Sequence, residues 1–180
     1  SNSETKPFKS KACCLLTLIL IFLIGNFSAF AETDGDYEYD VINGNEAEIT
    51  DYNGTGGTIT IPTTLGGNTV TSIGEKAFYY YFSASGLAVT VPDSVTNIGR
   101  WAFENASSLT SIATGNGVTS IGYAAFDDCT NLTTVTLGNS VTSIPDLAFN
   151  NCTSLTTINI PSSVTNITGG AFKRCLSLTT

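Results

Sequence analysis

Three equally spaced cysteines are the residues of this chain whose type and spacing first suggest chemistry. Cys129, Cys152 and Cys175 recur at one constant interval, each at the end of an Ala-Phe-x-x-Cys segment. Such cysteines could form a disulfide framework or bind zinc through their thiolates. Their number is odd, they lie along one line, and the equivalent residue one repeat earlier is Ala106. We therefore favour buried free thiols in a column of small side chains over a disulfide or a metal site.

Acidic side chains near the start of the chain raise the possibility of a calcium site. Asp34, Asp36 and Glu38 are spaced by two, like the first ligands of a calcium-binding loop. Such a loop needs glycine at its sixth position to make a sharp turn, and this chain has Tyr39 there. The sequence therefore predicts no metal site in this segment.

The composition argues against an enzyme and against binding to nucleic acid. The chain has no His, which removes Ser-His-Asp and Cys-His arrangements and the His-containing zinc sites. After Ala31 it has 14 acidic and 4 basic side chains, a formal charge of −10, which repels nucleic acid and anionic membrane surfaces. No phosphate loop, acid/base pair or activated nucleophile is recognisable. We expect a non-catalytic protein without a cofactor.

Four aromatic residues are the best candidates for contacts with a partner. They are Tyr79, Tyr80, Tyr81 and Trp101, and such residue types dominate interface energetics. Trp101 stands where the other repeats carry Lys76, Ala124, Leu147 and Gly170, so the position is variable and we expect it to be exposed. The alternative is that these aromatic side chains pack against their own repeat.

All these residues lie in or beside a sequence that repeats five times. The pattern V-T-[SN]-I-x-x-x-A-F begins at Val70, Val95, Val118, Val141 and Val164, and its last four starting points are evenly spaced. A fixed period of about 23 residues indicates a stacked repeat protein. The first repeat is irregular, because the aromatic segment at residues 78–82 and the residues after it lengthen it.

Aligned repeats place apolar residues in fixed columns, which predict the core. A side chain at the same place in every coil lies on a continuous line down the stack. The columns are Val95, Val118, Val141 and Val164; Ile98, Ile121, Ile144 and Ile167; Phe103, Phe126, Phe149 and Phe172; and Leu109, Leu132, Leu155 and Leu178. We expect Val-Thr-x-Ile to form a short β segment, and the Ala-Phe-x-x-Cys segment to form a single helical or 3₁₀ turn.

Residues 155–160 alternate between apolar and polar types, which predicts a strand that pairs with its equivalents in neighbouring coils. The polar positions of these strands define an expected concave face. They are Thr110, Ser111 and Ala113; Thr133, Thr134 and Thr136; and Thr156, Thr157 and Asn159. Solenoids commonly bind partners on such a surface, although threonine is also simply favourable on an exposed strand.

The two ends of the chain carry further predictions. Residues 1–31 combine three lysines, an apolar run at residues 12–24 and the small-x-small sequence Ala29-Phe30-Ala31, which is typical of a secretory signal peptide. The run is too short to cross a hydrocarbon core of about 30 Å. Residues 32–57 alternate on both sides of Asn43-Gly44, which predicts an acidic β-hairpin that caps the stack. Residues 58–180 then form the solenoid, with its last repeat truncated.

The repeats also resemble a known family. The pattern L-x-x-[IV]-x-[IL]-[PG]-x-x-V-T-x-I-x-x-x-A-F-x-x-C-x-x-L, as in residues 132–155, is similar to the leucine-rich repeats of the BspA (Treponema pallidum-type) class. The similarity spans residues 58–180 and departs from the pattern at Ala106, Ala113-Thr114 and Thr168-Gly169. It implies a β-rich α/β solenoid, right-handed and curved, with about five coils. It also implies a secreted or surface protein, mostly of bacteria and some protist parasites. Adhesion to host proteins such as fibronectin or fibrinogen is known for some members of the family.

These observations predict an exported, monomeric recognition or adhesion module that binds a protein or glycan. A host extracellular matrix protein is one such partner. The alternative is a structural spacer that presents another domain. Neither role involves a cofactor or nucleic acid.

Overall fold

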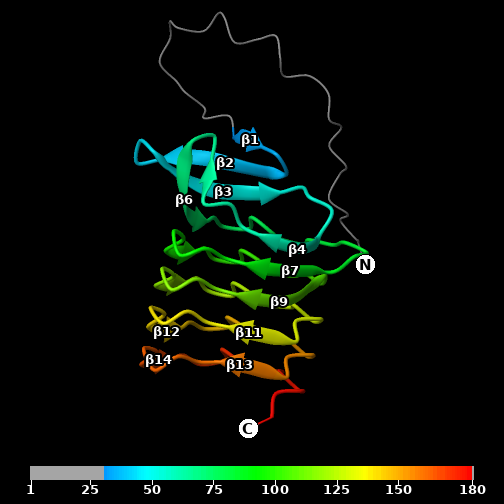
Figure 1. Ribbon diagram of the computed structural model, residues 1–180. Helices are drawn as coiled ribbons and strands as arrows, with labels where there is room; N and C mark the ends of the chain where they lie inside the picture. Colours follow the sequence, from blue (N-terminus) through cyan, green and yellow to red (C-terminus); the bar gives the residue numbers. More distant parts are fainter. Residues whose placement is uncertain (1–30, 180) are drawn as a thin grey trace, which may run out of the picture. The chain divides into compact units, whose positions relative to one another are not determined.

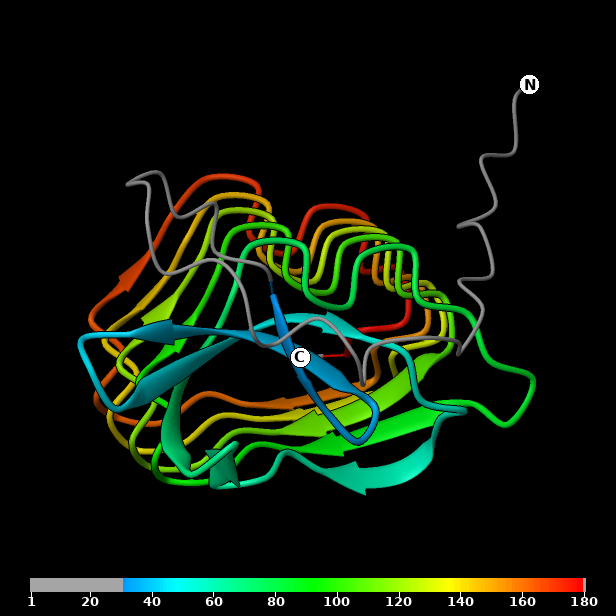
Figure 2. The same ribbon diagram turned by 90° about the horizontal axis from the view of Figure 1, so that it is seen from above.

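The computed structural model describes residues 31–179, which form 14 β-strands and no helix. Most strands stack on one another in coils of one repeat each, with equivalent segments directly above and below (Figure 1). Viewed along the stack, successive coils lie over one another (Figure 2). The apolar side chains of the coils are buried between their walls. No helix in this part of the chain could span a membrane. The predicted signal peptide, apart from Ala31, lies outside the described residues.

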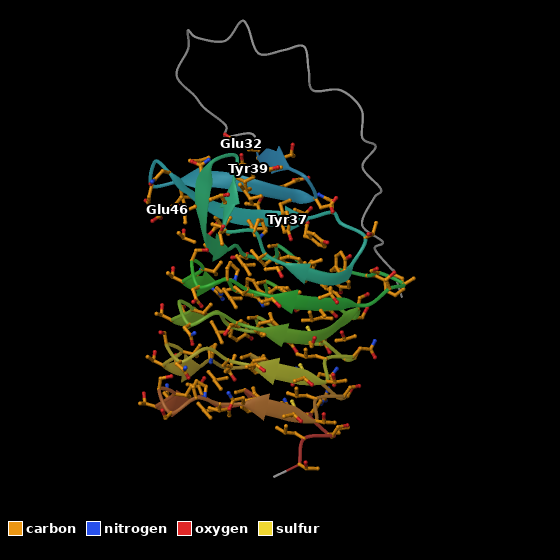
Figure 3. All side chains as sticks on the ribbon, viewed as in Figure 1. Glu32, Tyr37, Tyr39 and Glu46 are labelled. Atoms are coloured by element: carbon orange, nitrogen blue, oxygen red, sulfur yellow. The ribbon has the colours of Figure 1, made fainter. Side chains whose placement is uncertain are left out.

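An antiparallel hairpin covers the first coil, as the Asn-Gly pattern predicts. Strand β2 (Tyr37–Ile42) pairs with β3 (Glu46–Tyr52), and β1 (Glu32–Asp34) adds to the other edge of β2. The turn has positive φ at Asn43 (49°) and Gly44 (87°), which Asn-Gly readily adopts. Tyr39 Oη donates a hydrogen bond of 2.7 Å to Glu32 (Figure 3), and this contact fastens β1 to the hairpin.

The cap joins the solenoid through strand β6 (Asn68–Ile73), which pairs in parallel with β3 and antiparallel with β5 (Thr64–Leu65). The Ser72 hydroxyl, buried at this junction, donates a 2.8 Å hydrogen bond to Glu48 of the cap. The cap therefore extends the strand pairing of the coils.

A five-stranded parallel sheet forms one side of the stack. Its strands are β4 (Gly57–Thr60), β7 (Leu87–Thr90), β9 (Leu109–Ala113), β11 (Thr134–Thr136) and β13 (Thr157–Asn159), in the order β13-β11-β9-β7-β4. Thr134 pairs with Thr157 on one side and Ser111 on the other, so the register follows the sequence repeat. Between β7 and β9 the register shifts at Leu87/Ala88, which accommodates the irregular first repeat. This sheet confirms the predicted strand pairing.

The Val-Thr-x-Ile segments form a second line of parallel pairing, also as predicted. It consists of the two-residue strands β8 (Asn97–Ile98), β10 (Ser120–Ile121), β12 (Ser143–Ile144) and β14 (Asn166–Ile167). The β8 strand pairs with β6 and β10, and β12 pairs with β14.

The phenylalanine column is the centre of the core. The rings of Phe78, Phe103, Phe126, Phe149 and Phe172 stack with centroid separations of 4.6, 5.2, 5.0 and 5.4 Å. The first four are fully buried, and burial of each such ring contributes about 1.5–3 kcal/mol. The cap continues this column, because the Tyr52 ring stacks on Phe78 at 5.0 Å.

Apolar residues of the last coil are less buried than their equivalents. Ile167 is 49% exposed, whereas Ile144 in the preceding coil is fully buried. No coil of the described chain lies beyond Ile167 to cover it, and Val164, Phe172 and Leu178 are likewise only partly buried.

The Ala-Phe segment differs from the predicted helical turn. It is a series of hydrogen-bonded turns that contains two left-handed residues in each coil, and a right-handed helix cannot include them. In the second coil these residues are Trp101 (φ 56°) and Asn105 (φ 56°). Successive backbone N–H groups alternate between a carbonyl of the same coil and a carbonyl of the next coil. Ala102 donates to the Gly99 carbonyl (3.4 Å), and Phe103 donates to the Ala125 carbonyl of the next coil (2.7 Å).

Candidate recognition surface

The cysteine column uses its thiols structurally: Cys129 and Cys152 are buried in the core, and Cys175 in the last coil is half-buried. Cys129, Cys152 and Cys175 are free, and each Sγ donates to the carbonyl of a phenylalanine in the preceding coil, at 3.0, 3.2 and 3.0 Å. Burial raises the pKa of the Cys129 thiol and so suppresses the reactive thiolate. These side chains therefore act as small core residues that also bond adjacent coils.

Tyr81 occupies the same column as these cysteines. The sequence predicts it as a contact for a partner, but the structure buries it. Its side chain is 8% exposed and lies 5.4 Å from the Tyr52 ring. Its hydroxyl donates a 3.0 Å hydrogen bond to the Gly54 carbonyl. The larger side chain fills the space beside the cap where later coils carry cysteine, so Tyr81 is a core residue and is not available to a partner.

Tyr79 and Tyr80 lie outside this column. Their rings meet edge to face at 4.4 Å, and Tyr80 is 52% exposed. Tyr80 has a φ of 53°, in the left-handed region, which directs its side chain away from the column that buries Tyr81. In the aromatic segment, Phe78 and Tyr81 are therefore buried, Tyr79 is half-buried, and Tyr80 and Phe82 are exposed.

Trp101 lies at the centre of a cluster that combines aromatic rings with cations. Lys76 Nζ is 5.3 Å from the Trp101 ring centroid, and Arg100 Cζ is 4.6 Å from it. The Tyr123 ring meets Trp101 at 5.9 Å, nearly perpendicular, and Lys76 also lies 5.3 Å from the Tyr79 ring. We call Lys76, Tyr79, Arg100, Trp101 and Tyr123 the Trp101 cluster.

The cations of this cluster are held by aromatic rings and form no ion pair with a carboxylate among residues 31–179. Trp101 is half-buried, not exposed as expected, because it packs against these neighbours; a cation over a ring at such a surface contributes about 0.5–1 kcal/mol. Lys76 also acts on Glu104: burial and Asp127 raise the pKa of that carboxyl group, and Lys76 opposes them. Lys76 and Arg100 therefore keep a charge that an approaching acceptor group could use.

The sequence predicts only two of the five residues of the Trp101 cluster. Residue type predicts Trp101 and Tyr79 as contacts, but it does not single out Lys76, Arg100 and Tyr123. The signal lies in two adjacent variable columns, since Arg100 and Tyr123 are equivalent to each other, as are Lys76 and Trp101. Stacking of coils turns these sequence-distant positions into neighbours.

The predicted strand positions form a separate, uncharged surface. Thr134 and Thr136 of β11 are exposed and lie opposite Thr157 and Asn159 of β13. Adjacent strands are about 4.8 Å apart, so these four side chains form a compact polar group. Their side chains make no hydrogen bond within the described chain and can bond to water or a partner. The structure does not join this group to the Trp101 cluster in one site.

Among residues 31–179, no group of three or more His, Cys, Asp or Glu side chains is arranged to hold a metal ion.

Comparison with known proteins agrees with the repeat architecture. Residues 57–180 match the BspA type leucine rich repeat region in 6 copies. The chain is 31% identical to a leucine rich cell surface protein from Faecalibacterium prausnitzii A2-165, with a TM-score of 0.57, over 86% of this chain and 54% of that one. No match to the chain is found among curated proteins.

Two further solved structures have the same fold. A leucine-rich repeat protein from Bacteroides ovatus ATCC 8483 is 26% identical, with a TM-score of 0.56, over 83% of this chain and 46% of that one. One from Bacteroides capillosus ATCC 29799 is 26% identical, with a TM-score of 0.55, over 76% and 96%. This chain spans about half the length of the Faecalibacterium and Bacteroides ovatus proteins. With its repeats matched from residue 57 onward, the chain belongs to the BspA type leucine-rich repeat family.

Proposed function

We propose that this chain is a secreted or cell-surface recognition module that binds a protein or glycan without catalysis. Its family is built from repeats that generally serve protein binding, and one similar protein is described as a cell surface protein. Host extracellular matrix proteins are the first partners to test. We further propose that residues 1–31 are a signal peptide, residues 32–57 a cap and residues 58–180 a monomeric solenoid.

The observation that carries the proposal is the Trp101 cluster. A spacer needs only the residues that recur in every coil, because those residues build the stack. Trp101 and Arg100 depart from the repeat, and Trp, Tyr and Arg are the residue types enriched in binding hot spots. Their cation and ring contacts hold them in position before a partner arrives, which reduces the entropy lost on binding.

The exposed group on β11 and β13 supports a second, more polar contact area. Thr134, Thr136, Thr157 and Asn159 carry short side chains with few rotamers, so they lose little entropy when a partner orders them. A partner that contacts this surface would meet hydroxyl and amide groups and no charge.

A binding assay with the full chain tests this function. The immobilised ligands are fibronectin, fibrinogen, collagen and a glycan array. We expect saturable binding to at least one of them, and Trp101→Ala should weaken it about 30-fold, because truncation of a hot-spot residue costs about 2 kcal/mol. Leu147→Ala is the matched control. Leu147 lies in the same column with the same φ of 56°, but outside the cluster, so this variant should bind like the parent chain.

The opposite result would support the spacer. If folded, monomeric protein binds none of these surfaces, recognition by this part of the molecule is wrong. Equal weakening by Trp101→Ala and Leu147→Ala would mean that the column acts through stability, and the Trp101 cluster would lose its assigned role.

A further inference from the structure

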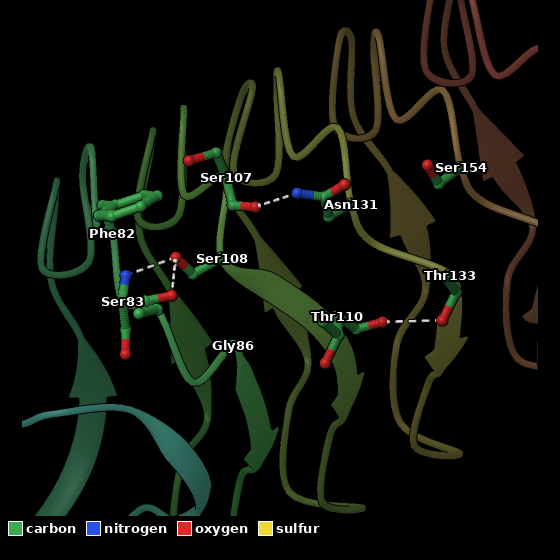
Figure 4. A pocket seen from close by; sticks show the side chains of 10 residues that line it. Phe82, Ser83, Gly86, Ser107, Ser108, Thr110, Asn131, Thr133 and Ser154 are labelled. Atoms are coloured by element: carbon green, nitrogen blue, oxygen red, sulfur yellow. Dashed lines mark hydrogen bonds between the residues drawn. The ribbon is translucent and has the colours of Figure 1, made fainter.

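A shallow hollow of about 400 Å³ lies at one edge of the five-stranded sheet and includes Thr110 and Thr133 of the predicted concave face, but no residue of the Trp101 cluster. Figure 4 shows its arrangement. Ser107, Asn131 and Ser154 follow one another along one side, Thr110 and Thr133 lie along the other, and Phe82 lies at one end. The polar residues come from successive coils, so the hollow runs across the stack.

Phe82 is unusual for its position in the repeat. Its side chain is 77% exposed, and its equivalents in the next three coils are Ser107, Thr130 and Thr153. Nothing in the core requires an aromatic ring there, because the preceding residue, Tyr81, already fills the buried column. Exposure of a phenylalanine ring to water is unfavourable, and a ligand that covers it would recover that free energy.

The ring is attached to a fixed piece of backbone. The Ser108 hydroxyl accepts from Ser83 N–H at 2.5 Å and donates to the Ser83 carbonyl at 3.1 Å (Figure 4). Residues 84–86, which have no equivalent in the later coils, close a turn in which Gly86 N–H donates to the Ser83 carbonyl at 3.2 Å. Gly86 has a φ of 71°, which glycine adopts without strain.

The hollow offers free acceptors on Thr110, Thr133 and Asn131, and both donors and acceptors on its serine hydroxyls. Thr110 Oγ1 donates to the Leu87 carbonyl and Thr133 Oγ1 to the Thr110 carbonyl, both at 3.0 Å, which leaves oxygen lone pairs free. Asn131 Nδ2 donates to the Ser107 carbonyl at 2.7 Å, so its Oδ1 remains an acceptor. The Ser107 and Ser154 hydroxyls make no hydrogen bond within the described chain. A ligand rich in donors would fit these groups.

The charge of the hollow restricts the ligand further. Among residues 31–179, no charged side chain lines it, so no cation is present to pair with a phosphate, sulfate or carboxylate group. The chain after Ala31 carries a formal charge of −10, which repels such anions. A neutral molecule with many hydroxyl donors and an apolar C–H face to lie on an aromatic ring satisfies each condition, and saccharides have this chemistry.

We propose that the hollow is a binding subsite for a neutral saccharide, which stacks on Phe82 and donates hydrogen bonds to Asn131, Thr110 and Thr133. This inference rests on the proposed recognition function and adds a ligand class and a second site. It assigns the hollow to sugar and leaves the Trp101 cluster to the partner tested above.

A binding array with two sets of oligosaccharides tests the inference. The neutral set consists of hexose and N-acetylhexosamine oligomers, and the acidic set of sialylated and uronate oligomers. The full chain should bind members of the neutral set in preference to the acidic one. Phe82→Ala should weaken this binding about tenfold, because an aromatic stacking contact has about that effect on affinity. Phe82→Trp should bind at least as tightly as the parent chain.

Leu176→Ala is the matched control, because Leu176 lies in the Phe82 column at the other end of the stack and is 81% exposed. It should bind like the parent chain. Phe82→Leu separates two ligand classes, since a sugar stacks on an aromatic ring, whereas an apolar peptide side chain packs on leucine as well. Retained affinity in Phe82→Leu would therefore overturn the saccharide in favour of a peptide.

Two other outcomes of the array would overturn the saccharide subsite. Preference for the acidic set, or no binding to either set, would contradict the inference. If the chain still binds a matrix protein in that case, and Trp101→Ala weakens this binding, the recognition function stands and only the sugar subsite is wrong.

Discussion

At the scale of single residues, the left-handed positions explain how a variable column can coexist with a regular backbone. The equivalents Lys76, Trp101, Ala124 and Leu147 have φ between 52° and 62°, and Gly170 has a φ of 79°. The backbone conformation therefore recurs although the side chain does not. A left-handed non-glycine residue costs about 1–2 kcal/mol, and here packing and hydrogen bonds between coils offset it.

Gly170 provides a direct test of this cost. Gly170→Ala should lower the free energy of unfolding by about 1 kcal/mol, because its φ is positive and a Cβ would lie 2.9 Å from Asp146 Oδ1. Gly169→Ala is the control, since φ there is not positive and nothing lies within 4 Å of its Cβ. It should be neutral or raise the free energy by about 0.4–1 kcal/mol. Denaturant unfolding of both variants measures the difference, and equal effects would contradict it.

Residue type alone cannot separate Tyr81 from Trp101, because it predicts both as contacts with a partner. The Ala-Phe-x-x-Cys alignment contains the necessary signal, because it places Tyr81 in the buried column of Ala106 and Cys129. The roles of Lys76 and Arg100 could not be predicted in this way. They depend on side-chain directions in left-handed turns, which the sequence does not specify.

At the scale of elements, the repeat predicts the strands well and the turn poorly. The strand at residues 155–160 and its partners follow from alternation and period, and β11 and β13 pair in that register. The length of the Ala-Phe segment predicts a helical turn. The segment instead sends alternate N–H groups to the next coil, as Phe103 N–H does to the Ala125 carbonyl, and this pairing between coils overrides local helix propensity.

The phenylalanine column should carry a large share of the stability of each coil. Phe126→Ala should lower the free energy of unfolding by about 3–5 kcal/mol, because the ring is fully buried and stacks 5.2 Å from Phe103 and 5.0 Å from Phe149. Phe82→Ala makes the same change at an exposed site and should stay within about 0.5 kcal/mol of the parent chain. Chemical denaturation compares them, and a similar loss in both would show that the column is not the core.

At the scale of the whole molecule, negative charge opposes the compact stack. After Ala31 the formal charge is −10, and the pI of the sequence is about 4.2. Like charges in equivalent positions of adjacent coils are brought close by the short rise of the stack, as with Glu104 and Asp127. This repulsion is the general cost of a soluble acidic surface, and protonation should relieve it.

Stability should therefore rise as the pH falls from about 7.5 to about 5. Burial raises the pKa of Glu104 and of Asp127 from their ordinary values; Asp127 further raises the pKa of Glu104, and Asp128 that of Asp127. A carboxyl group whose pKa is higher in the folded state binds protons more tightly there, so protonation favours folding and the benefit is lost as pH rises through that pKa.

Thermal unfolding followed by circular dichroism should give a higher Tm near pH 5. Asp127→Asn should raise the Tm at pH 7.5, keep the acceptor for Asn150 Nδ2 now at 2.7 Å, and flatten the pH dependence. Added salt at pH 7.5 should act in the same direction by screening the charges. A Tm that falls between pH 7.5 and 5, in parent chain and variant alike, would show that repulsion along the stack does not limit its stability.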